Sequence, residues 1–114
     1  MDYAGGNSRN QKGAIVTTNI LFSAYCACHL CCGPTAPNPT AMGTRPVEGR
    51  TIAGPRNIPL GTWVRVTVEG KAYRFRVEDR TARKWDGRRW DVFLKSHEAA
   101  RKWGLKRGSV EILP

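Results

Sequence analysis

Apolar and polar residues alternate along two neighbouring segments of the chain, 63–69 and 73–79. A period of two is typical of half-buried β-strands, because successive side chains point to opposite faces of a sheet. Gly70 and Lys71 lie between the segments and fit a tight turn. We therefore expect the two strands to form an antiparallel hairpin.

Shorter apolar runs rich in β-branched and aromatic residues predict further strands. They are 15–25, a short run that opens at Arg50, 90–94 and 109–113. Twelve glycines and seven prolines also favour short strands and frequent turns over long helices.

One segment near the C-terminus suits a helix. Ser96 is a good N-cap, Glu98 places negative charge in the first turn, and Gly104 fits the C′ position. We therefore expect a helix over about 97–103. Together, about six short strands and this helix predict an all-β fold, a small closed barrel.

The length of 114 residues indicates one domain. Residues 1–13 are polar and glycine-rich and are predicted to be a disordered tail. The domain then covers 14–114, with a long cysteine-rich loop at 26–49. The apolar segment 15–25 is too short and too polar to span a membrane, and we interpret it as a strand rather than a signal peptide.

The charge balance is strongly positive: nineteen basic residues oppose nine acidic ones, and the net charge is +10. An anionic partner follows, and nucleic acid, anionic lipid and bacterial wall polymers all qualify. No arginine-rich block or recognised nucleic-acid motif is present, which argues against nucleic acid. We expect a monomer without a membrane span.

Two aspartates stand out in so cationic a chain. Asp79 ends one strand-like run, and Asp91 lies at the start of another. One hypothesis is a carboxylate site that breaks a glycosidic bond. The alternative is that both aspartates form structural ion pairs with arginines at 80, 88 or 89.

Several segments, taken in order, resemble a known family. They are 50–62 (RTIAGPRNIPLGT), 77–79 (VED), 90–93 (WDVF) and 96–104 (SHEAARKWG). This set is similar to the three-aspartate (3D) domain, a six-stranded double-psi β-barrel. That domain is shared with the membrane-bound lytic transglycosylase A family and with stationary-phase and resuscitation-type wall proteins. The resemblance covers roughly 20–113.

The resemblance implies peptidoglycan as substrate and non-hydrolytic cleavage of the MurNAc–GlcNAc bond. It assigns the catalytic acid/base to Asp91 and the family's second aspartate to Asp79. The sequence departs from the family in two places. Gly54 stands where the first aspartate is expected, and Arg80-Thr81-Ala82 replaces the usual Thr-Gly-Gly.

A lytic transglycosylase needs no protein nucleophile, because the C6 hydroxyl of the sugar attacks. One residue can donate the first proton and later accept the hydroxyl proton, and Asp91 is the candidate for both steps. Trp90 and Val92 should point to the opposite strand face from Asp91. Asp79 would orient a substrate group or raise the proton affinity of Asp91.

The basic loop 80–89 offers candidate substrate contacts. The Trp85 ring can stack on a sugar, Arg88 and Arg89 can hold muropeptide carboxylates, and Thr81 is a further candidate. The alternatives are ordinary packing for the tryptophan and a solvated face for the arginines.

Four cysteines, Cys26, Cys28, Cys31 and Cys32, fall within seven residues, with His29 among them. Two disulfides in an oxidising compartment, a zinc site and free thiols all remain open. No second cluster completes a conventional zinc ribbon, and no other cofactor is expected. His97 is expected to cap or pack at the helix start.

The leading hypothesis is a small murein transglycosylase, secreted or in the bacterial cell envelope, or phage-encoded and acting on the cell wall. The absence of the first aspartate at Gly54 favours a second hypothesis, a non-catalytic glycan-binding barrel of the expansin type. A third is a basic nucleic-acid-binding barrel, whose affinity would fall steeply with salt.

Overall fold

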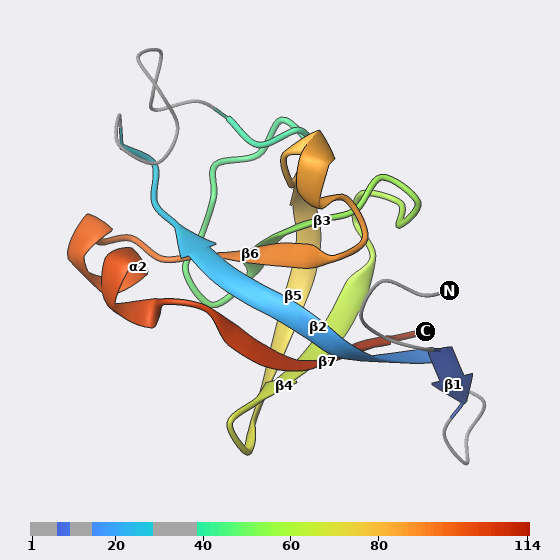
Figure 1. Ribbon diagram of the computed structural model, residues 1–114. Helices are drawn as coiled ribbons and strands as arrows, with labels where there is room; N and C mark the ends of the chain where they lie inside the picture. Colours follow the sequence, from blue (N-terminus) through green and yellow to red (C-terminus); the bar gives the residue numbers. More distant parts are fainter. Residues whose placement is uncertain (1–6, 10–14, 29–38) are drawn as a thin grey trace.

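The computed structural model describes residues 7–9, 15–28 and 39–114 (Figure 1). Short strands dominate this part of the chain. The elements in chain order are β1 Asn7–Arg9, β2 Ile15–Tyr25, β3 Thr51–Gly54, β4 Trp63–Val68, β5 Lys71–Arg80, the 3₁₀ helix η1 Arg83–Trp85, β6 Arg89–Phe93, α2 His97–Trp103 and β7 Lys106–Ile112.

Six of the strands close into a barrel. Their order is β2-β6-β3-β5-β4-β7, and β7 pairs back onto β2. The pairs β2–β6 and β3–β5 are parallel and the other four are antiparallel. The predicted six-stranded barrel is therefore confirmed. The short strand β1 pairs antiparallel with β2. It belongs to the predicted tail 1–13, and the other residues of that tail lie outside the described part of the chain.

The predicted hairpin is β4 and β5, paired antiparallel from Trp63 opposite Arg76 to Val68 opposite Lys71. Its two-residue turn is Glu69-Gly70, one residue earlier than expected. Both residues have positive φ, 50° and 77°. Such angles match the twist of the flanking strands, which explains why the strands continue straight into so short a turn.

The core fills the barrel interior. Residues 64, 66 and 68 of β4 are buried, and alternate residues are exposed, as the sequence pattern predicts. Ile52 of β3 lies between Val77 and Val92 on the neighbouring strands, and all three are at most 2% exposed. The wider core adds Ile20, Phe22, Phe75, Trp90 and Val110.

The helix α2 has the predicted bounds. The Ser96 hydroxyl accepts a hydrogen bond from the Ala99 amide at 3.2 Å, and Gly104 ends the helix with φ 70°. Trp103 donates its indole N–H to the Phe22 carbonyl at 3.0 Å, which attaches the helix to β2. In Figure 1, α2 lies at the end of the barrel where β2 terminates.

The last strand begins earlier than expected, at Lys106 instead of 109. The polar run Lys-Arg-Gly does not have the composition of a strand. Gly108 nevertheless lies so close to the Thr67 carbonyl of β4 that a side chain would collide with it. The tertiary contact therefore selects glycine within the strand. None of the helices in the described residues is long and apolar enough to cross a membrane.

Candidate active site on the outer face of the barrel

A β-bulge in β5 sets the direction of Asp79. Ile52 lies opposite Val77, but the next residue, Ala53, lies opposite Asp79, so Glu78 is the extra residue. Regular alternation would send Glu78 outward and Asp79 into the core. The bulge resets the alternation and turns Asp79 to the outer face, as bulges near functional sites often do.

This register assembles a row across four strands. Ala53 lies opposite Asp79 on one side and opposite Asp91 on the other, and Asp91 in turn lies opposite Ser23 of β2. Directly opposed residues point to the same face of a sheet. We call Asp79, Ala53, Asp91 and Ser23 the aspartate row.

Asp91 is half-buried and lies between Trp90 and Val92, which are only 3% and 2% exposed. Trp90 and Val92 therefore point to the opposite face of β6 from Asp91, as predicted. Ser23 donates a hydrogen bond to Oδ1 of Asp91. Among the described residues, Ser23 is the only hydrogen-bond partner of this carboxylate, and Oδ2 has none.

Ser23 is itself held by Arg89. The Nε of Arg89 donates to the Ser23 hydroxyl at 2.8 Å, and its guanidinium lies 4.8 Å from the centre of the Trp85 ring. Ser23 is 4% exposed. Arg89 of β6 and Ser23 of β2 thus orient the Asp91 carboxylate, and we call this chain of hydrogen bonds the Asp91 relay.

Asp79 has different surroundings. Its Oδ2 accepts a hydrogen bond from the Tyr25 hydroxyl at 3.1 Å. Its Oδ1 accepts from the backbone amides of Ala41 and Arg80 at 3.1 and 2.9 Å. Because β6 and β3 lie between β2 and β5, Tyr25 connects strands that do not pair. Asp79 is therefore more tightly held than Asp91.

The structure does not show the ion pairs proposed as the alternative for these two aspartates. Within the described residues, no lysine or arginine nitrogen lies within 4.0 Å of either carboxylate. The Arg80 guanidinium instead donates to the carbonyls of Pro55 and Ile58, at 2.5 and 2.6 Å. Arg80 therefore holds the loop after β3 in place through these two hydrogen bonds.

Glu78, the extra residue of the bulge, adjoins the aspartate row and has a fully buried carboxylate. Arg50 donates to it from Nε at 2.6 Å, and the hydroxyls of Thr44 and Thr51 donate at 2.7 and 3.1 Å. Burial alone would raise the pKa of Glu78. The Arg50 and threonine hydrogen bonds, with the Arg50 charge, outweigh burial and hold the pKa below its usual value.

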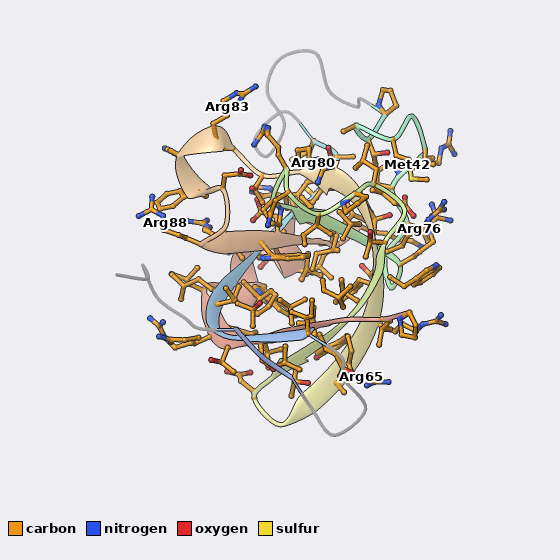
Figure 2. All side chains as sticks on the ribbon, turned by 90° about the vertical axis from the view of Figure 1, so that its right-hand side faces the viewer. Met42, Arg65, Arg76, Arg80, Arg83 and Arg88 are labelled. Atoms are coloured by element: carbon orange, nitrogen blue, oxygen red, sulfur yellow. The ribbon has the colours of Figure 1, made fainter. Side chains whose placement is uncertain are left out.

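The candidate substrate residues divide into two groups. Trp85 is half-buried and is surrounded by cations, with Lys84 at 5.3 Å and Arg88 at 5.9 Å from the ring centre in addition to Arg89. Figure 2 shows Arg83 and Arg88 extending outward around η1. Thr81, in contrast, is 2% exposed, so it offers little surface to a ligand.

The Trp90 ring lies against Gly54, the position where the family resemblance places the first aspartate. A Cβ at Gly54 would lie 2.9 Å from the Cζ3 atom of Trp90. Real Cβ atoms do not approach other atoms so closely. An aspartate at position 54 is therefore incompatible with this indole position, and the departure from the family extends to the packing around it.

A cavity of about 260 Å³ lies elsewhere on the molecule. Its walls are mainly apolar and include Ile20, Ile58, Trp90 and Val110. Neither Asp79 nor Asp91 lines it. The candidate chemistry therefore lies on the outer face, away from this cavity.

The cysteine cluster is partly visible. Cys26 and Cys28 follow β2, and their sulfur atoms lie 3.0 Å apart. Both sulfurs face Nδ1 of His97, at 3.6 and 3.4 Å. Cys31 and Cys32, the other two predicted metal or disulfide residues, lie outside the described residues.

Sequence reasoning missed three residues of this region: Ser23, Tyr25 and Glu78. Ser23 and Tyr25 belong to an apolar run that otherwise suggests a plain strand. Their only local signal is that they share a face, two residues apart. Glu78 adjoins Asp79, but its burial depends on the bulge.

No family model matches the chain, and no curated protein matches it by sequence. The closed barrel nevertheless has the fold expected of a double-psi β-barrel. Among solved structures it is similar to the crystal structure of MltA from E. coli, with a TM-score of 0.56 and 21% sequence identity. The similarity covers 69% of this chain, which spans 28% of that MltA chain. This likeness shows the fold, a closed six-stranded barrel similar to that of MltA.

Proposed function

We propose that the protein is a peptidoglycan lytic transglycosylase that cleaves the MurNAc–GlcNAc bond, with Asp91 as its acid/base. The observation that carries the proposal is the Asp91 carboxylate, which Ser23 orients on a barrel similar to that of MltA, a lytic transglycosylase. Ser23 orients one carboxylate oxygen, and the other accepts no hydrogen bond from the described residues. The proposed substrate implies action at the cell wall.

In the proposed reaction, protonated Asp91 gives its proton to the glycosidic oxygen as the C1–O bond breaks. The MurNAc C6 hydroxyl oxygen then forms a bond to C1, and the Asp91 carboxylate accepts the hydroxyl proton. The products are a 1,6-anhydro-MurNAc end and a free GlcNAc hydroxyl. Asp91 returns to its starting state, so no water enters the products.

The surroundings of Asp79 support a single acid/base. Asp79 and Asp91 are separated by one intervening strand, so their Cα atoms lie about 10 Å apart. Both oxygens of Asp79 already accept hydrogen bonds, from the Tyr25 hydroxyl and from the amides of Ala41 and Arg80. We therefore assign Asp79 to orient substrate together with Tyr25, and not to act as nucleophile.

Binding of the wall polymer is assigned to the cationic surface around η1. Trp85 offers an aromatic face for a sugar ring, and Arg88 is exposed beside it to pair with a peptide carboxylate. Arg89 lies in both this surface and the Asp91 relay, and therefore connects binding to the acid/base.

One observation favours a second function, non-catalytic binding of wall glycans. Trp90 fills the space that an aspartate at Gly54 would need, so one family carboxylate is excluded sterically. A barrel that has lost this group would retain the cationic binding surface without turnover.

Incubation with peptidoglycan sacculi and mass spectrometry of the soluble products separates these functions. Wild type, Asp91→Asn and the control Glu98→Gln are compared; Glu98 lies on α2 and its side chain is 61% exposed. We expect anhydro-muropeptides from wild type and Glu98→Gln only. Reducing-end products would indicate a hydrolase. No product, with all three proteins pelleting on sacculi, would leave the binding function.

A further inference from the structure

The strand β2 ends beside the helix α2 at one end of the barrel (Figure 1). Three potential metal ligands meet there. They are Sγ of Cys26, Sγ of Cys28 and Nδ1 of His97, and all lie within 4.8 Å of one another. His97 is 69 residues from Cys28 in sequence. The fold, not local spacing, therefore brings the imidazole to the sulfurs.

We propose that Cys26, Cys28 and His97 form a zinc-binding site, which joins the cysteine-rich loop to the first turn of α2. Thiolate and imidazole are the ligands that structural zinc sites use most. The site is partly enclosed, since Cys26 is 1% exposed and the other two residues are half-buried.

The distances can be compared with tetrahedral coordination. Zn–S bonds of about 2.3 Å and Zn–N bonds of about 2.0–2.1 Å place sulfur and nitrogen about 3.6 Å apart, and two sulfurs about 3.8 Å apart. The two sulfur–nitrogen distances are 3.6 and 3.4 Å. The sulfur–sulfur distance of 3.0 Å must increase by about 0.8 Å when zinc binds.

Binding is balanced in protons and charge. Two thiols lose their protons to solvent and the neutral imidazole keeps its Nε2 proton, so two thiolates neutralise Zn²⁺. The role is structural and independent of the acid/base on β6. Metal binding should therefore stabilise the fold whether or not the protein cleaves peptidoglycan.

The test uses the full chain, purified under reducing conditions and titrated with Zn²⁺ and Co²⁺. We expect one zinc per chain by native mass spectrometry, a thiolate-to-cobalt absorption band, and a melting temperature that rises with zinc. His97→Ala should weaken zinc binding by more than about 100-fold, since even outer-shell changes cost 10–100-fold. Cys28→Ser should weaken zinc binding to a similar extent.

Lys102→Gln, which changes an exposed residue on the same helix as His97, is the matched control and should bind zinc as wild type does; its side chain is 72% exposed. His97→Gln provides a second variant if His97→Ala does not fold, as judged by circular dichroism. Wild-type zinc affinity in the His97 variants would overturn the proposal. A reduced, folded wild-type protein that takes up no zinc would also overturn it.

Discussion

Asp79 and Asp91 both lie directly opposite Ala53, one on each neighbouring strand of the barrel. Ala53, which is 2% exposed, therefore lies between the two aspartates in the sheet. Because the bulge at Glu78 creates this alignment, the candidate site depends on a backbone irregularity beneath it.

Asp91 and Asp79 should differ in their effect on peptidoglycan cleavage. Asp91→Asn removes the acid/base and should lower kcat by about 10²–10⁴-fold, the usual contribution of such a group. Asp79→Asn keeps the shape of the side chain that orients substrate, and it should lower kcat by a smaller factor. Rates of release of soluble muropeptides measure both. An equal loss in the two variants would contradict a single acid/base.

Ser23 is predicted to be a positioning residue. Ser23→Ala removes the hydrogen bond to Asp91 and leaves Arg89 without its hydroxyl partner. We expect kcat to fall by about tenfold, as expected for loss of one hydrogen bond worth about 1.4 kcal/mol. Pelleting on sacculi should be unchanged. Weaker binding with unchanged kcat would assign Ser23 to substrate contact.

Glu78→Gln should destabilise the fold by about 3 kcal/mol. This value is the lower end of the range for breaking a buried ion pair, because the Arg50 side chain is 35% exposed and regains water. Chemical denaturation measures the loss. Glu69→Gln is the control, since that side chain is 67% exposed, and its effect should stay within about 0.5 kcal/mol.

Glu78 also predicts a dependence of stability on pH. The folded-state pKa is lowered, so the unfolded state binds its proton first as pH falls. The stabilisation is present above the unfolded pKa of about 4.3 and is lost as pH falls through the lower, folded value. The free energy of unfolding of wild type should therefore fall more steeply below about pH 4 than that of Glu78→Gln. Parallel curves would show that Glu78 is not the group responsible.

Gly54→Ala should cost about 1–3 kcal/mol, because its Cβ meets the benzo ring of Trp90. The cost should fall in a Trp90→Phe background, which lacks that ring. A double-mutant cycle of unfolding free energies measures the coupling. Additive effects would mean that Trp90 does not restrict position 54.

Local patterns predicted much of the fold. The alternation in 63–68 and the caps at Ser96 and Gly104 predict a strand and a helix correctly, because they depend on side-chain periodicity and on backbone groups a few residues away. Both candidate aspartates were also identified from the sequence, through their strand positions and their resemblance to a family motif.

Long-range packing determined the rest. The barrel places β6 between β2 and β3, although β6 is distant from both in sequence. Ser23 can reach Asp91 only because of this arrangement. The bulge at Glu78 has no local signature, because a single extra residue is defined only by the partner strand. The approach of His97 to Cys26 likewise depends on where α2 packs, since contacts between distant residues follow from the closed barrel as a whole.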